Sequence, residues 1–131
     1  FTFVLPGFEP GTLRAEGYIK GKKCAEFVRM TPDKAAKLEL SMEEGTTDKI
    51  CENDIIFIYA NVTDEKGTTV PDADNTVRFS VSGPARLIGQ NPIKAEAGIG
   101  SVLLQICGGS GEIKLTAEAD GLKAASMVIS L

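Results

Sequence analysis

Apolar and polar side chains alternate with a period of two along most of this chain of 131 residues. In residues 12–19, for example, Leu13, Ala15 and Ile19 alternate with polar positions such as Arg14. That period is typical of β-strands with one face towards a core, and no helical stripe of useful length occurs. The pattern therefore predicts an all-β protein.

Residues 11–30 have the pattern of a β-hairpin. Lys20-Gly21-Lys22 supplies the turn, and Cys24 to Met30 forms the returning strand. An isolated hairpin is only marginally stable in water, so this one must pack against something else. Thr31-Pro32-Asp33-Lys34 then predicts a boundary, because proline removes a ladder donor and restricts the residue before it.

Residues 35–131 contain about seven short strands separated by turns, as all-β sandwiches do. The apolar run from Ile55 to Thr63 predicts a central strand, and Arg86 to Gly89 predicts an edge segment. An immunoglobulin-like antiparallel β-sandwich is the natural solution, although the Trp and the disulfide of antibody domains are missing. The residues expected to face its core are Val77, Phe79, Val81, Leu115, Ala117, Met127 and Ile129.

The composition excludes several classes of function. There is no histidine, so this chain holds no Ser-His-Asp triad, Cys-His dyad or imidazole metal site. Its net charge of −4 argues against nucleic-acid binding, and the basic stretch Lys20-Gly21-Lys22-Lys23 is too short to change that. No apolar run approaches the length of a membrane span. The expected partners therefore include neither nucleic acid nor membrane.

Three cysteines, Cys24, Cys51 and Cys107, lie far apart in the sequence. With three cysteines, at least one has no disulfide partner within the chain. The sequence contains no CxxC pair, so a zinc site is not expected. Cys107 follows the apolar run 102–106 and is expected to be a small buried hydrophobe. Free thiols also occur in exported proteins, so the cysteines do not fix the compartment.

Asp64, Asp72 and Asp74 cluster around two predicted turns. They could bind Ca²⁺, which prefers several oxygen ligands, but the spacing lacks the full EF-hand pattern. Asp is also a common turn former because its side chain bonds nearby backbone amides. Turn formation is the favoured interpretation, and no metal or cofactor is expected.

Other polar and aromatic residues have similarly ordinary interpretations. Glu43-Glu44, or Glu52 with Asp54, could be proposed as an acid and a base, yet they lie near loops and are more simply solvated charges. Sugar-binding modules usually present Trp or Tyr rings, and here only Tyr18 and Tyr59 are candidates for a weak glycan contact. Both lie in predicted strands, where packing is the favoured interpretation.

The sequon Asn61-Val62-Thr63 carries almost no information if the protein is bacterial.

Two stretches resemble one known family. Residues 10–18 read PGTLRAEGY, and Gly21-Lys22 follow. This is similar to the end of the immunoglobulin-like domain after the barrel in bacterial family-two glycoside hydrolases. Residues 60–67 read ANVTDEKG, residues 70–75 read VPDADN, and residues 77–83 read VRFSVSG. This resembles the signature of the terminal sandwich domain in the same enzymes.

The resemblance implies a β-galactosidase-type parent that hydrolyses β-galactosides, or related glycosides, with two glutamates on a (β/α)₈ barrel. None of the eleven glutamates here maps onto that pair, so no catalytic residue is carried over. Residues 1–31 would be the C-terminal strands of a preceding β-sandwich domain, and residues 35–131 a non-catalytic accessory domain. The loop at Gly89-Gln90-Asn91-Pro92 is shorter than in many members of the family.

The expected partners are the catalytic barrel and other domains of the parent, and a dimer of this chain through residues 1–31. The chain begins at Phe1 without Met, so it has the look of an excised fragment, and the parent is expected in the periplasm or outside the cell. The alternative is an adhesin- or invasin-like immunoglobulin-like module, or a carbohydrate-binding module, that acts by itself. A self-sufficient module should not carry the tail of another domain, and residues 1–31 have that character.

Overall fold

The computed structural model describes residues 2, 4, 6–43 and 50–131. The chain divides into two compact units, residues 1–32 and 33–131, and each is described by itself. The described residues form strands and no helix, and they therefore include no helix that could cross a membrane. The strands are β1 (Thr12–Ile19), β2 (Lys22–Met30), β3 (Lys37–Met42), β4 (Ile55–Thr63), β5 (Thr76–Ser82), β6 (Ala85–Ile88), β7 (Ile93–Lys94), β8 (Ile99–Ile106), β9 (Glu112–Glu118) and β10 (Ala125–Ser130).

The first unit is the predicted hairpin, formed by β1 and β2 in antiparallel register. Lys20 and Gly21 both have positive φ, 49° and 76°, as a tight type I′ turn requires. At the open end, the Thr31 amide donates to the Gly11 carbonyl at 2.8 Å. The register shifts between Gly17 and Tyr18, a bulge that the strict alternation of the sequence did not predict.

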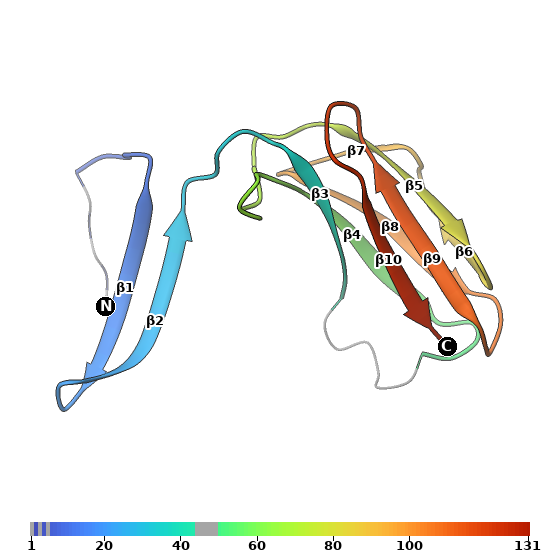
Figure 1. The fold of residues 1–131 in the computed structure, drawn as a ribbon, viewed down its shortest axis with the longest axis horizontal. Helices are drawn as coiled ribbons and strands as arrows, with labels where there is room; N and C mark the ends of the chain where they lie inside the picture. Colours follow the sequence, from blue (N-terminus) through green and yellow to red (C-terminus); the bar gives the residue numbers. More distant parts are fainter. Residues whose placement is uncertain (1, 3, 5, 44–49) are drawn as a thin grey trace. The chain divides into compact units, whose positions relative to one another are not determined.

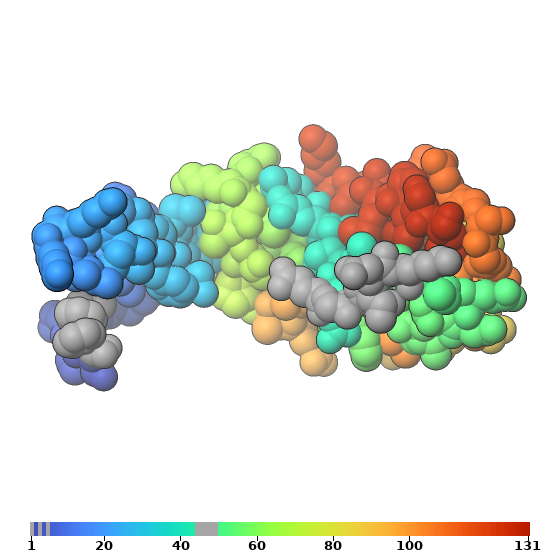
Figure 2. All heavy atoms as spheres, turned by 90° about the horizontal axis from the view of Figure 1, so that it is seen from below, coloured from blue at the N-terminus to red at the C-terminus, as the bar shows by residue number. Residues whose placement is uncertain are grey.

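The second unit is an antiparallel β-sandwich, which confirms the predicted immunoglobulin-like architecture (Figure 1). One sheet has the strand order β3-β4-β8-β6 and the other β10-β9-β5-β7. The central position of β4 and the edge position of β6 were both predicted. The sheets also meet along one side, where Leu38 N–H donates to Lys123 O at 2.9 Å and Lys123 N–H to Ala36 O at 3.0 Å. In Figure 2 the teal residues of β3 accordingly lie beside the red residues of the β10 region.

Alternation places one side of each strand between the sheets. Ile58, Leu104 and Leu115 are fully buried there. All seven residues predicted to face the core do so: five are buried and two are half-buried against it. The five are Val77, Phe79, Leu115, Ala117 and Ile129, and the two are Val81 and Met127.

Two features of the sandwich differ from expectation. β7 was not predicted, because its two residues are too few to show a period and its pairing partner, β5, lies more than ten residues away. Cys107 is exposed, so the prediction of a buried thiol is wrong. The strand ends at Ile106, whose side chain is the last to point inwards, and Cys107 lies beyond it.

Candidate functional site

The Asp64 side chain ties the start of the sandwich to the turn after β4. Its carboxylate is 1% exposed and accepts three backbone N–H groups: Asp33 at 3.0 Å, Lys66 at 2.9 Å and Thr68 at 2.8 Å. These hydrogen bonds, above all the one from Asp33, hold the pKa of Asp64 below its ordinary value of 3.8. The carboxylate therefore organises the chain around itself.

The other two aspartates of the predicted cluster have different surroundings. Asp74 forms an ion pair with Lys94 at 2.9 Å, which lowers the pKa of Asp74, and Asp72 is exposed. Within residues 2, 4, 6–43 and 50–131, no group of three or more acidic or Cys side chains is arranged to hold a metal ion. Asp64 has the turn geometry that the sequence favoured, in which a carboxylate bonds nearby amides.

The remaining candidate carboxylates lie around the β3–β4 connection. Asp54 accepts a hydrogen bond from the Cys51 amide at 2.7 Å, which closes a local turn, and Glu52 is exposed. The Glu43 amide donates to the Phe57 carbonyl at 3.2 Å and so extends the pairing of β3 with β4. Glu44 lies outside the described residues.

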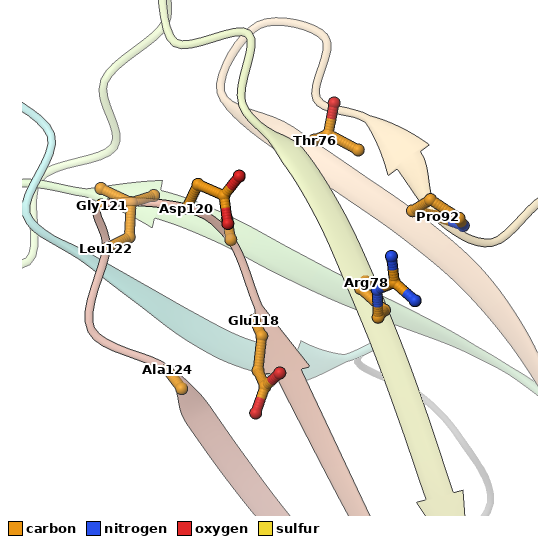
Figure 3. Close-up of a pocket in the computed structure, with 9 residues that line it drawn as sticks. Thr76, Arg78, Pro92, Glu118, Asp120, Gly121, Leu122 and Ala124 are labelled. Carbon is orange, nitrogen blue, oxygen red and sulfur yellow. The ribbon is translucent and has the colours of Figure 1, made fainter.

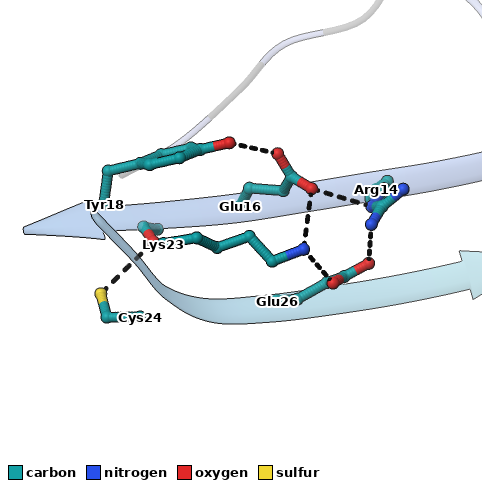
Figure 4. Close-up of polar contacts among 7 residues, drawn as sticks. Arg14, Glu16, Tyr18, Lys23, Cys24 and Glu26 are labelled. Carbon is teal, nitrogen blue, oxygen red and sulfur yellow. Dashed lines mark hydrogen bonds and ion pairs between the residues drawn. The ribbon is translucent and has the colours of Figure 1, made fainter. Parts of the chain in front are cut away.

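One face of the hairpin carries a network of charged side chains (Figure 4). Arg14 and Lys23 each pair with both Glu16 and Glu26; the Arg14–Glu16 and Lys23–Glu16 distances are 3.1 Å. The Tyr18 hydroxyl donates to Glu16 at 2.6 Å. This bond, followed by that from Lys23, lowers the pKa of Glu16, while the Glu16 carboxylate raises the pKa of Tyr18. Each of these polar groups has its hydrogen-bond or ion-pair partner within the network, which is typical of a solvated outer face.

The two tyrosines considered for glycan contact belong to different units. Tyr18 is 59% exposed and its hydroxyl belongs to the hairpin network, so the packing favoured for it from the sequence is wrong. Tyr59 lies on β4, where its ring is parallel to that of Phe57, with centroids 6.2 Å apart and an interplanar angle of 7°. Asn61, the sequon residue, lies two positions further along β4 and donates to the Ser41 hydroxyl at 3.4 Å.

A depression of about 400 Å³ lies at the turn between β9 and β10 (Figure 3). Arg78 and Glu118 are direct neighbours across β5 and β9, yet they form no ion pair. In Figure 3 the carboxylate of Glu118 points away from Asp120. None of the residues that line the depression is aromatic, so it lacks a stacking surface for a sugar ring.

Asn91 is a structural residue that the sequence did not single out. Its carboxamide accepts the Phe79 amide at 2.9 Å and donates to the Phe79 carbonyl at 2.8 Å. It thereby pairs with β5 as a neighbouring strand would. The only local signal is an Asn before Pro92, which favours a turn but does not name the distant partner.

Comparisons with a family model, with curated proteins and with solved structures all lead to the same family. The model of the glycoside hydrolase family 2 C-terminal domain 5 matches residues 38–128. The beta-galactosidase BoGH2A of Bacteroides ovatus is 36% identical over 94% of this chain, and a beta-galactosidase of Thermoanaerobacter pseudethanolicus is 34% identical over 82%. The crystal structure of a beta-glycosidase from Bacteroides vulgatus superposes with a TM-score of 0.81 and 26% identity, covering 98% of this chain.

The matches cover most of this chain but little of each relative. The chain spans 16% and 14% of the two curated relatives, and 18% of the crystallised chain. Of the two stretches that carry the resemblance, residues 60–83 lie within the region that the family model matches, and residues 10–22 lie outside it. The chain belongs to the glycoside hydrolase family 2 C-terminal domain 5 family.

Proposed function

We propose that this chain is the non-catalytic C-terminal part of a larger β-galactosidase that acts on β-galactosides or related glycans. The observation that carries the proposal is the match to beta-galactosidases along 94% and 82% of this chain but only 16% and 14% of theirs. The catalytic barrel belongs to the rest of the parent polypeptide. The same matches favour a glycosidase over an adhesin or a separate carbohydrate-binding module.

The chemistry of the described residues supports a non-catalytic role. A retaining glycosidase needs two carboxyl groups about 5 Å apart across a substrate cleft, one of them kept protonated. Here Asp64 has a lowered pKa and is enclosed by backbone amides, and Asp54 is occupied by its own turn. The work of the domain is therefore structural: it supports the catalytic portion of the parent.

The hairpin fits the role of the last strands of a preceding β-sandwich domain, so that residues 1–31 and 35–131 belong to different domains. Leu13, Ile19 and Phe27 lie on its face opposite the charged network and are 59%, 65% and 55% exposed. Two strands with an exposed apolar face are marginal in water and need a further layer. A preceding sandwich would supply that layer and leave the charged face outside.

The experiment compares the full parent with this chain in turnover of a nitrophenyl β-galactoside. We expect activity only in the parent, because the acid and the nucleophile lie outside residues 1–131. Turnover by the purified chain above a buffer blank, or a parent reading frame without a glycosidase barrel, would overturn the proposal. We further propose a periplasmic or extracellular location, which cell fractionation of the parent's host tests directly.

A further inference from the structure

Strand β4 is apolar on both of its faces. Ile56 and Ile58 point into the core and are 2% and 0% exposed, whereas Ile55 and Phe57 point outwards and are 56% and 45% exposed. A continuous apolar run is the pattern of a strand covered on both sides. The second sheet covers only the inner side of β4.

The outward apolar side chains continue across neighbouring strands. Leu103 on β8 lies opposite Phe57, and Ile88 on β6 lies opposite Leu103. Tyr59 packs parallel to Phe57. We call this surface the outer apolar face; its residues are Ile55, Phe57, Tyr59, Ile88, Ile99 and Leu103.

The outer surface of the other sheet is different. Its outward positions are polar on β5 and β9, for example Arg78 and Ser80 on β5 and Lys114 on β9. Val128 on β10, 57% exposed, is the apolar exception. Outward positions are thus polar on β5 and β9, and also at Glu39 and Ser41 on β3, but not along β4. The outward apolar side chains of β4 indicate that this part of the first sheet is covered by a partner.

We propose that the outer apolar face is the surface through which this domain docks onto the catalytic portion of its own polypeptide. This inference rests on the proposed function, because it takes the partner from the parent chain. The chain spans 14–16% of the beta-galactosidases it matches, so most of such a polypeptide lies outside it. A tethered domain is present at an effective concentration on the order of millimolar, which favours it over a second copy.

The test places a charge on the face and compares Phe57→Lys, at a side chain that is 45% exposed, with Val128→Lys on the other sheet, where the side chain is 57% exposed. Each variant is made in the full parent and in this chain. The unfolding midpoint of the sandwich is followed by pulse proteolysis with a C-terminal tag. In this chain both variants are expected to melt close to the unsubstituted protein, because both side chains are already exposed.

In the parent, Phe57→Lys is expected to lower the midpoint by about 4–8 °C, from the burial value of half a Phe side chain and the size of the domain. Val128→Lys is expected to leave the midpoint unchanged. Phe57→Leu, which keeps an apolar side chain, is expected to lower the midpoint much less than Phe57→Lys does. Equal midpoints for the two lysine variants in the parent would overturn the proposal. So would an equal loss in parent and chain, or a dimer of this chain that Phe57→Lys dissolves while the parent is unaffected. These readings need no enzyme turnover, so they are separate from the assay of the proposed activity.

Discussion

Gly98 and Gly121 offer a matched test of how closely the loops of the sandwich are packed. Both have left-handed backbone, with φ of +76° and +75°. A Cβ on Gly98 would lie 2.3 Å from the Val70 carbonyl oxygen, whereas a Cβ on Gly121 would meet nothing within 4 Å. The two Gly→Ala variants therefore share the backbone cost and differ in the clash.

The magnitude follows from these two contributions. Left-handed backbone costs a non-glycine residue about 1–2 kcal/mol, which the stiffer unfolded chain offsets by about 0.4–1 kcal/mol. Gly121→Ala should thus cost roughly 0–1.6 kcal/mol. Gly98→Ala adds overpacking of about 1–3 kcal/mol, because the atom that it meets is backbone and cannot rotate away. It also displaces the Gly98 carbonyl, which accepts the Val62 amide at 2.8 Å.

Urea denaturation followed by far-ultraviolet circular dichroism measures both variants. We expect Gly98→Ala to be less stable than Gly121→Ala by about 1–3 kcal/mol, with an unchanged denaturant slope. Equal free energies of unfolding would refute the reasoning, because they would mean that the loop carrying Val70 moves aside at no cost. A changed slope would show instead that the native or the denatured state had been altered.

Three further outcomes are expected. Asn91→Ala should lower the free energy of unfolding by about 1–3 kcal/mol, since two hydrogen bonds to Phe79 are lost. A Gln105→Ala control on the outer surface should lower it by less, and a larger loss for Gln105→Ala than for Asn91→Ala would contradict the structural role of Asn91. Because the pKa of Asp64 is lowered on folding, the stabilisation that Asp64 provides is present above pH 3.8 and is lost as pH falls through the lowered pKa. Asp64→Asn should therefore weaken the pH dependence of acid unfolding in this range, and identical acid profiles for the two proteins would contradict the structural role of Asp64. Residues 1–31 should pair with a second copy of the chain or with the sandwich of the same chain, and solution scattering and hydrogen exchange measure this pairing. A monomer whose first thirty-one residues exchange like a free coil would contradict this prediction.

The strands that the sequence predicts well are those with a regular period and a polar outer face. β5 and β9 alternate strictly, and β10 does so except at Val128, so their inward residues could be named in advance, Phe79 and Leu115 among them. Such a prediction uses only the pleat of a strand, which is a local property. The positions of β7 and Cys107 could not be obtained in this way, because a two-residue strand and a strand end have no period to measure.

The contacts that hold the loops depend on residues far apart in the sequence. Asp64 bonds the amide of Asp33 thirty-one positions earlier, and Asn91 bonds Phe79 twelve positions earlier. The sequence correctly favoured turn formation for Asp64, since its bonds to Lys66 and Thr68 are local. The long-range partner in each case is set by how the strands are ordered in the sheets, and no single stretch of sequence contains that information.

Strand β4 shows what a departure from alternation can indicate. Its apolar run predicted a central strand, and it does lie between β3 and β8. Being central in a sheet, however, explains the pairing of its backbone and not the apolar character of its second face. That face belongs to Ile55, Phe57 and Tyr59, and the second sheet packs against the opposite side of the strand. The excess of apolar side chains over what this fold buries therefore marks the surface where the rest of the parent protein should be sought.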